Sequence, residues 1–296
     1  MTVAFTKIQK EAAKTLIKLS LEEDLNQPGD LTCQALIKES DQAEIQIVAR
    51  DTGILAGSLL ASLVFSELDS AVECTLHLSD GDTLEHGSII STCSGPLASI
   101  LIGERTVLNF MSHLCGVASL TAKYVQAIQG TNATILDTRK TLPGWRILEK
   151  YAVTAGGGTN HRMGLYDGIL IKDNHLAAWA TRNSHSTIAD AIRQSRESVN
   201  GKIGIEVEVD TLDQLVDALQ AEPEIVLLDN MPPEILIQAI HLRNEQSPTT
   251  LLEASGGINL ETVRNVAETG VERISVGALT HSAVSLDIGF DWKQRT

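Results

Sequence analysis

Residues 201–230 read GKIGIEVEVDTLDQLVDALQAEPEIVLLDN, and this stretch decides the fold class. It begins with a run rich in Ile and Val at 203–209 and continues with apolar residues at helical spacing. It ends in a second apolar run at 225–228. A strand, a helix and a strand in this order predict a βαβ unit with parallel strands. Because the strands are mainly apolar, we expect both of their faces to be buried.

The same alternation extends to both sides of this unit. Further apolar runs occupy residues 133–138, 167–174, 251–257 and 273–281, and a helical pattern follows each of the first three. Six β-like runs alternating with helices predict an α/β fold, and polar or glycine-rich tips on the strands are typical of α/β barrels. Since a complete barrel has eight units, we expect an incomplete barrel. A doubly wound open sheet is the alternative.

The N-terminal third of the chain has a different pattern. Residues 1–24 form an amphipathic helical pattern, and residues 43–57 alternate like an exposed strand that leads to a glycine turn. Residues 58–68 are a helix candidate, and residues 71–101 read as short strands joined by Asp-Gly and His-Gly turns. This combination predicts an α+β module with an antiparallel sheet.

Composition limits the class of protein. The chain carries 38 acidic and 23 basic side chains, a net charge of −15, whereas nucleic-acid partners require a broad basic face. No run of about 18 apolar residues is present, so we expect no membrane-spanning helix and no membrane partner. The four cysteines form no Cys-x-x-Cys pair. Their scatter favours reduced thiols and a cytoplasmic location over a disulfide framework or a zinc site.

One stretch departs from the acidic background. Residues 137–175, DTRKTLPGWRILEKYAVTAGGGTNHRMGLYDGILIKDNH, carry six basic and four acidic side chains. A locally basic site in an acidic protein concentrates positive potential where a small anionic ligand binds. The three glycines at 156–158 are expected to let the backbone approach that ligand closely.

Basic side chains lie at the expected strand ends. Arg139 and Lys140 follow the first predicted barrel strand, and His161 and Arg162 follow the three glycines. Arginine binds a carboxylate or phosphate through two parallel hydrogen bonds, and lysine acts as a point charge. Lys172 follows the second predicted strand, where it could bind phosphate or form a Schiff base. A solvated charged surface is the alternative for these residues.

Carboxylates and glycine-rich loops complete the predicted rim of strand ends. Glu206 and Glu208 lie on the same side of one strand, and Asp229 ends the next. Carboxylates near a phosphate site usually hold Mg²⁺, often through water, and they could also stabilise a developing cation. For one of them, a salt bridge to a neighbouring lysine is the alternative. The loops at 255–257 and 277–278 offer backbone N–H groups to a phosphate, unless their glycines only make tight turns.

Taken together, these segments resemble the quinolinate phosphoribosyltransferase family, the decarboxylating nicotinate-nucleotide pyrophosphorylases of NAD biosynthesis. The resemblance runs almost from end to end, and its most specific part is the central motif at 136–175. It implies an N-terminal open α+β sandwich domain over residues 1–113 and an incomplete α/β-barrel catalytic domain over residues 114–296. The C-terminal tail could pack back on the N-terminal domain. The family forms homodimers, sometimes hexamers, in which the subunits share each active site.

The activity implied by the resemblance is that of a glycosyltransferase, more narrowly a pentosyltransferase. The family transfers the phosphoribosyl group of phosphoribosyl pyrophosphate to quinolinate, with decarboxylation to nicotinate mononucleotide, and uses Mg²⁺. The implied catalytic residues are Lys140, Lys172, Glu208 and Asp229, of which Glu208 and Asp229 also hold the metal through water or substrate. The implied substrate-binding residues are Arg105, donated across the dimer, and Thr138, Arg139, Lys140, His161, Arg162, Lys172, Glu208, Asp229, Ser255, Gly256, Gly257, Gly277 and Ala278.

The chemistry of these residues fits that reaction. Quinolinate carries two carboxylates, and its co-substrate carries a phosphate and a pyrophosphate, so one site must hold several negative charges at once. Three other functions stay open. They are a phosphoribosyltransferase for nicotinate, a non-catalytic barrel that senses phosphorylated metabolites, and a Schiff-base aldolase that uses Lys172. A second arginine for a second carboxylate favours quinolinate.

Overall fold

The computed structural model describes residues 4–182, 187–199 and 203–292, which fold into two compact units. The first unit comprises residues 1–122, 141–157 and 279–296, and the second comprises residues 123–140 and 158–278. The chain passes between the units more than once. The domain division expected at residues 113 and 114 stays a prediction.

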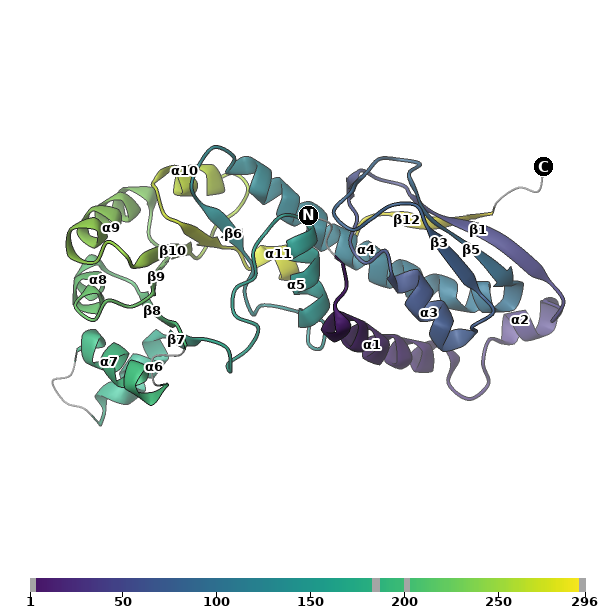
Figure 1. The fold of residues 1–296 in the computed structure, drawn as a ribbon, viewed down its shortest axis with the longest axis horizontal. Coiled ribbons are helices and arrows are strands. Elements are labelled where there is room, and N and C mark those ends of the chain that lie inside the picture. The colour runs from purple at the N-terminus through teal and green to yellow at the C-terminus, as the bar shows by residue number, and fades with distance from the viewer. Residues whose placement is uncertain (1–3, 183–186, 200–202, 293–296) are drawn as a thin grey trace. The chain divides into compact units, whose positions relative to one another are not determined.

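The first unit contains an antiparallel sheet of four strands, as the N-terminal pattern predicts (Figure 1). The strand order is β12 (Ile288–Trp292), β1 (Gln42–Ala49), β5 (Ile89–Pro96) and β3 (Glu73–Leu76). Alternation in β1 buries Ile45 and Ile47, which are 1% and 0% exposed. The last strand of the chain, β12, pairs with β1. Two short strands, β2 (Gly53–Ile54) and β4 (Thr83–Leu84), form a separate pair.

The first unit also contains helices. They are α1 (Lys7–Leu25), α2 (Leu31–Leu36), α3 (Leu60–Leu68), α4 (Leu97–Ala127) and α5 (Arg146–Ala155). In Figure 1, α3 and the first half of α4 lie against the sheet, and α1 packs on α3. Residue Gly103 permits the close contact of α3 with α4, because a Cβ there would lie 2.6 Å from Phe65 Cε1. The helix α4 continues without a break from Leu97 to Ala127.

The backbone conformation and packing of the first unit require two of the three consecutive glycines. A Cβ on Gly156 would lie 2.3 Å from the carbonyl oxygen of Ala118 on α4, so only glycine fits where the end of α5 meets α4. Gly157 has a φ of +86°, in the left-handed region that favours glycine after a helix. We expected these glycines to face a ligand. At Gly156 the close approach is instead to another helix.

The second unit is built on a six-stranded parallel sheet, as predicted. Its order is β6 (Thr134–Leu136), β11 (Arg273–Ser275), β10 (Leu251–Ser255), β9 (Ile225–Asp229), β8 (Ile205–Val209) and β7 (Ile169–Ile171). The helices between the strands are α6 (Asp173–Ala180), α7 (Ile188–Ser198), α8 (Leu212–Leu219), α9 (Pro233–Gln246) and α10 (Val263–Glu268), and α11 (Ala278–His281) follows β11.

The strand order favours the incomplete barrel over the doubly wound sheet. Strands β7 to β11 lie side by side in chain order. Strand β6, which precedes them in the chain, lies beside β11, so the order of strands in the sheet never reverses. Right-handed crossovers that all run one way place their helices on one face. Consecutive helices α6 to α10 accordingly contact one another as a single layer. Beyond β6 the segment at 158–162 adds one more extended stretch, through a parallel bridge between Leu136 and Thr159.

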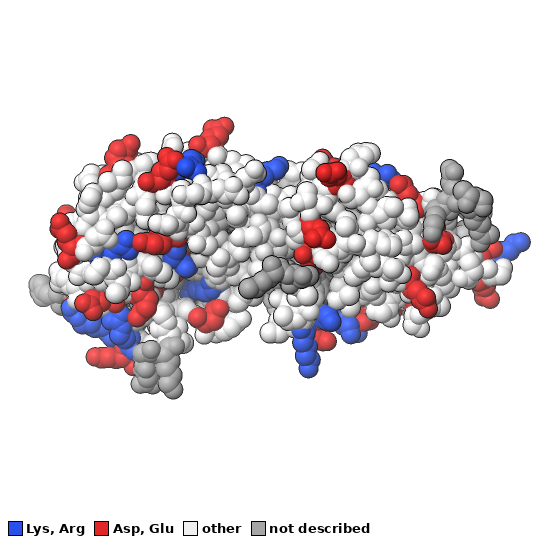
Figure 2. Space-filling view, turned by 45° about the horizontal axis from the view of Figure 1, so that its top comes forward, with Lys and Arg blue, Asp and Glu red and all other residues white. Residues whose placement is uncertain are grey.

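Charges of both signs are mixed on one face of the molecule. On the face in Figure 2, Lys and Arg side chains are interspersed with Asp and Glu. Within the described residues, no helix combines the length and the apolar character that crossing a membrane requires.

The close packing at Gly156 predicts a large effect of one methyl group. Gly156→Ala should lower the free energy of unfolding by about 1–3 kcal/mol, because α4 and α5 must move apart. The matched control is Gly204→Ala, where the nearest atom to the new Cβ is 4.0 Å away. The measurement is urea denaturation of both variants. Equal stability of the two would contradict the packing role of Gly156.

Candidate active site

The second unit brings most of the predicted site residues to one edge of its sheet. The carboxyl ends of parallel strands meet at the same edge, which is where barrel enzymes place their sites. Strand-end positions are held by Thr138, Arg139 and Lys140 after β6, Lys172 after β7, Glu208 in β8, Asp229 in β9, Ser255 in β10, and Gly277 and Ala278 after β11. His161 and Arg162 lie on the segment beside β6.

Two guanidinium groups lie near each other at this rim. The pKa of Arg162 is below its ordinary value, first because the group is partly buried and second because the charge of Arg139 is close. Arg162 is held in place by a 2.9 Å hydrogen bond from Nη1 to the carbonyl oxygen of Gly168, directly before β7. Two close cations repel each other, and an anion between them relieves that repulsion. This pair therefore fits a ligand with carboxylate or phosphate groups.

Lys172 and Glu208 form an ion pair at the next two strand ends. The Nζ of Lys172 lies 2.5 Å from Oε2 of Glu208, and the two side chains are 44% and 13% exposed. His175 fixes the backbone of the lysine, because its Nδ1 accepts a 2.9 Å hydrogen bond from the Lys172 N–H. The salt bridge considered as an alternative for one carboxylate is thus present at Glu208. A ligand that needs either group must compete with this pair.

The loops after β9 and β10 are joined by a hydrogen bond. The N–H of Asn230 donates to the carbonyl oxygen of Ser255 at 2.9 Å, and the Asn230 amide donates to Asp229 Oδ2 at 2.7 Å. Gly256 has a φ of +92°, and a Cβ there would lie 2.2 Å from Asn230 Oδ1. This glycine is required by the contact between the loops. A Cβ on Gly257 would meet no atom within 4 Å, so its backbone is open to a ligand.

A buried ion cluster lies inside the second unit, and only part of it was predicted. Its members are His161, Glu206, Glu253 and Arg273. The Nε2 of His161 lies 3.0 Å from Oε2 of Glu206 and 3.4 Å from Oε1 of Glu253. On its other oxygen Glu253 accepts a 2.7 Å hydrogen bond from Nε of Arg273. Glu206 and Glu253 are 5% and 0% exposed. The cluster joins the segment beyond β6 to β8, β10 and β11.

The cluster favours the protonated form of His161. Burial alone would lower the pKa of His161, but hydrogen bonds and charges from Glu206 and Glu253 outweigh it and raise the pKa to about 9. The backbone N–H of Arg162 points at Nδ1 of the ring, 2.7 Å away, and favours the neutral form. Two carboxylate charges at Nε2 are stronger than one amide dipole at Nδ1, so the raised pKa stands.

The three possible ligand atoms of the cluster are also spaced closely enough to hold a metal ion. One ligand atom each from His161, Glu206 and Glu253 lies within 4.8 Å of the other two. In this chain the charges of the two carboxylates are already balanced by the imidazolium and by Arg273. We therefore interpret the group as an ion cluster. A charged residue inside an otherwise apolar strand, as in LLEAS at 251–255, was the sequence signal for it.

Arg105 belongs to the first unit, where it is exposed on α4. Its assignment to a site shared between subunits stays a prediction. His113, also in the first unit, contacts the ring of Trp145 edge-on. Its Nε2 also lies 2.8 Å from Oε1 of the fully buried Glu149.

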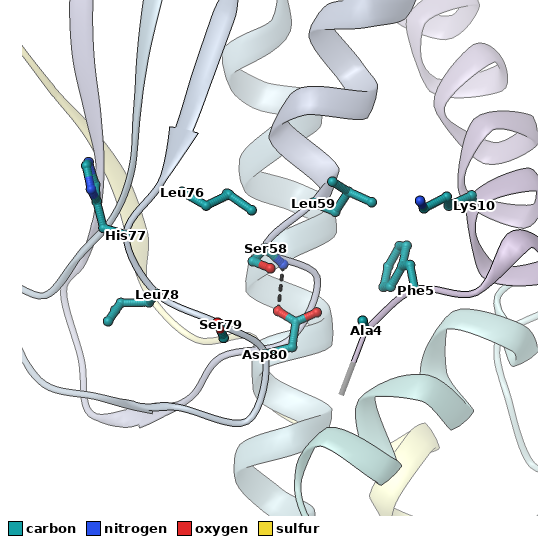
Figure 3. Close-up of a pocket in the computed structure, with 10 residues that line it drawn as sticks. All are labelled: Ala4, Phe5, Lys10, Ser58, Leu59, Leu76, His77, Leu78, Ser79 and Asp80. Atoms are coloured by element: carbon teal, nitrogen blue, oxygen red, sulfur yellow. Dashed lines mark hydrogen bonds between the residues drawn. The ribbon is translucent and has the colours of Figure 1, made fainter. Parts of the chain in front are cut away.

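The first unit has a pocket of its own, with a volume of about 320 Å³ (Figure 3). It lies between the residues before α1, the start of α3 and the loop after β3. Its buried acid, Asp80, accepts a 2.8 Å hydrogen bond from the N–H of Ser58, drawn as a dashed line, and another from the hydroxyl of Tyr151. These bonds give Asp80 a role in holding the walls together. None of the predicted site residues lines this pocket.

Comparison with known proteins identifies the family. Residues 30–115 match the N-terminal domain of quinolinate phosphoribosyl transferase, and residues 117–291 match its C-terminal domain. The chain belongs to the quinolinate phosphoribosyltransferase family. It is 45% identical over 263 residues to a probable nicotinate-nucleotide pyrophosphorylase (carboxylating) of Bacillus subtilis, covering 89% of this chain and 88% of the relative. It is 43% identical to the Mycobacterium leprae enzyme of that name, with 95% and 97% coverage.

Solved structures of the quinolinate phosphoribosyltransferase family agree with this fold. The nicotinate-nucleotide pyrophosphorylase of Francisella tularensis superposes with a TM-score of 0.88 at 34% identity, over 99% of both chains. The family therefore confirms the predicted fold class, an N-terminal α+β domain with an antiparallel sheet and an incomplete α/β barrel.

The raised pKa of His161 predicts a pH-dependent stability. A group whose pKa rises from about 6.5 in the unfolded chain to about 9 in the folded one stabilises the protein fully below the lower value. That contribution, on the order of 3 kcal/mol, is lost as the pH rises through 9. His161→Gln should remove this dependence, measured as the free energy of unfolding between pH 6 and about 9.5.

The exposed His86 provides the matched control, His86→Gln. This variant should follow the wild-type curve. If His161→Gln also follows it, His161 is not held protonated by the cluster.

Proposed function

We propose that this protein transfers the phosphoribosyl group of phosphoribosyl pyrophosphate to quinolinate and releases pyrophosphate and CO₂, forming nicotinate mononucleotide. The observation that carries the proposal is the placement of Arg139 and Arg162 at the same rim of the sheet, together with the family of the chain. A dicarboxylate needs two such groups, since each guanidinium can bind one carboxylate through two hydrogen bonds. The same edge of the sheet carries two lysines, two carboxylates and open backbone for the co-substrate.

For quinolinate, we assign Arg139 and Arg162 to the carboxylates, with Thr138 beside them. Thr138 shapes this turn, because its Oγ1 accepts a 3.0 Å hydrogen bond from the Lys140 N–H. His161 belongs to the proposed binding set, but its Nε2 faces Glu206 and Glu253. Its proposed contribution is therefore to anchor the segment that carries Arg162.

For phosphoribosyl pyrophosphate, we assign the phosphate to the loops that follow β10 and β11. The open backbone at Gly257 supports this placement. Lys140 and Lys172 would lie between the two substrates, where point charges can contact both. The residues assigned to the phosphate are Ser255, Gly256, Gly257, Gly277 and Ala278.

The donor set at β8 and β9 fits Mg²⁺. Glu208 and Asp229 provide carboxylate oxygens at neighbouring strand ends, and hard cations prefer oxygen ligands. These two residues would hold the ion through water or through the substrate. When bound, Mg²⁺ neutralises charge on the pyrophosphate. Lys172 would turn from Glu208 to the substrate as the ion pair opens.

The proposed reaction proceeds by charge stabilisation and positioning. The pyridine nitrogen attacks C1 of the ribose as the bond to pyrophosphate breaks, and the ribose acquires oxocarbenium character. Carboxylates of Glu208 and Asp229 stabilise that positive charge. Arg139 and Arg162 hold the ring in line with C1, which removes much of the entropic barrier. The resulting cationic ring stabilises the carbanion left by loss of CO₂, and a proton then completes nicotinate mononucleotide.

A turnover assay with quinolinate, phosphoribosyl pyrophosphate and Mg²⁺ tests the proposal. Equal yields of nicotinate mononucleotide and CO₂ are expected. Arg139→Ala should raise the quinolinate KM by about 10-fold or more, since a charge-assisted hydrogen bond contributes about 1.5–3 kcal/mol. The KM for phosphoribosyl pyrophosphate should change little. Arg193→Ala is the matched control, because Arg193 is a half-exposed arginine of α7 that pairs with Asp190.

Other outcomes of this assay identify the alternatives. Turnover of nicotinate in place of quinolinate would indicate the non-decarboxylating reaction. No turnover of either substrate would favour the metabolite sensor, and trapping of a carbonyl substrate on Lys172 by borohydride would favour the aldolase. Wild-type kinetics in Arg139→Ala would contradict the carboxylate assignment.

We also propose that the protein is a homodimer, with a hexamer as the larger alternative, in which Arg105 of one subunit completes the site of the other. Exposure of Arg105 on α4 is compatible with donation to a partner. A cytoplasmic location stays a prediction.

Subunit mixing tests the shared site. Arg105→Ala and Lys172→Ala should each be nearly inactive, because each removes one charge from every site. After random exchange, half of the dimers carry one site with both substitutions and one with neither, so roughly a quarter of wild-type activity should return. Verified heterodimers without activity would contradict the proposal.

A further inference from the structure

Two cysteines that are not neighbours in sequence lie opposite each other on adjacent strands of the first unit's sheet. Cys74 in β3 and Cys93 in β5 are direct partners in the antiparallel register. Their Sγ atoms are 2.6 Å apart. Neither residue is joined to the other in a disulfide, and neither forms part of a Cys-x-x-Cys pair.

The register places this pair at the kind of position that accepts a disulfide. The N–H of His77 donates to the carbonyl oxygen of Ile90 at 2.9 Å, so residues 77 and 90 form a hydrogen-bonded pair of the ladder. Hydrogen-bonded and non-hydrogen-bonded pairs alternate along antiparallel strands, which makes Cys74 and Cys93 a non-hydrogen-bonded pair. The Cα atoms of such pairs are about 4.5 Å apart, within the range that a disulfide spans.

We propose that Cys74 and Cys93 are a thiol pair that reacts with low-molecular-weight disulfides and closes into a cross-strand disulfide. The thiolate of Cys74 attacks one sulfur of the small disulfide and releases one small thiolate. Cys93 then attacks the sulfur of Cys74, and the second small thiolate leaves with the proton of Cys93. Two protein thiols and one small disulfide become one protein disulfide and two small thiols.

The environments of the two thiols set this order of attack. Cys74 is partly exposed on the edge strand β3, whereas Cys93 is 0% exposed. The hydrogen bond between the two thiols lowers the pKa of Cys74, against the effect of burial. The same contact and burial raise the pKa of Cys93. Cys74 is thus both the reachable sulfur and the better source of thiolate, and Cys93 is the resolving thiol.

The disulfide would close a loop that contains one wall of the pocket in the first unit. Residues 74–93 include Leu76 to Asp80, which line that pocket (Figure 3). Ser58 and Tyr151 already hold this loop through Asp80. A covalent link at its other end removes freedom from the unfolded chain and should raise the unfolding temperature.

The test uses the full-length protein and glutathione disulfide as the probe. Treated protein should lose two of its four thiols, its mass should fall by two hydrogens, and peptide mapping should join Cys74 to Cys93. The unfolding temperature should rise by roughly 5 °C. Dithiothreitol should reverse every change. The double variant Cys33→Ser/Cys115→Ser, which leaves only the proposed pair, should respond like the wild type.

Cys74→Ser is the decisive variant because its side chain is partly exposed and the substitution is tolerable in an edge strand. It should keep Cys93 reduced, show no temperature shift and retain the unoxidised protein's stability. Three results would overturn the proposal. They are four thiols remaining in the folded wild type, a stable glutathione adduct on Cys74 with Cys93 still reduced, and a disulfide that joins any other two cysteines. None of these measurements depends on the proposed enzymatic reaction.

Discussion

The buried cluster of His161, Glu206, Glu253 and Arg273 is the interaction on which the arrangement of the second unit depends. It joins an extended segment beyond β6 to three strands of the sheet, and it does so from inside. Buried carboxylates are tolerated only with partners, so each member of the cluster fixes where the others lie. The residue after His161 is Arg162, and its position at the rim follows from this anchoring.

The arrangement also explains how an acidic protein can bind anions. The chain has a net charge of −15, yet close cations gather at one edge of one sheet. Acidic groups within the same unit form ion pairs with nearby cations. Glu206 and Glu253 compensate His161 and Arg273, and Glu208 pairs with Lys172. The rim therefore retains Arg139 and Arg162 as a pair of like charges, which is a local arrangement that net charge alone does not describe.

Local pattern was enough to predict the six parallel strands and the strand-end positions. Each strand is a short apolar run, and polar residues such as Asp229 follow where the strand ends. Features that depend on residues distant in sequence were missed or misassigned. Gly156 was assigned to a ligand but permits contact with α4, and the ion cluster requires β8, β10 and β11 to be placed together. The pairing of Cys74 with Cys93 depends on the register of two strands, which cysteine spacing does not reveal. The roles assigned to the site residues rest on the family resemblance and stay proposals.

The pairing of β12 with β1 has a consequence for synthesis of the chain on the ribosome. Strand β1 emerges early, but one of its edges has no partner until residues 288–292 have been made. Throughout that interval the nascent sheet presents open N–H and C=O groups, which can pair with another chain. Protection of this edge by a chaperone would thus limit aggregation until β12 has been made.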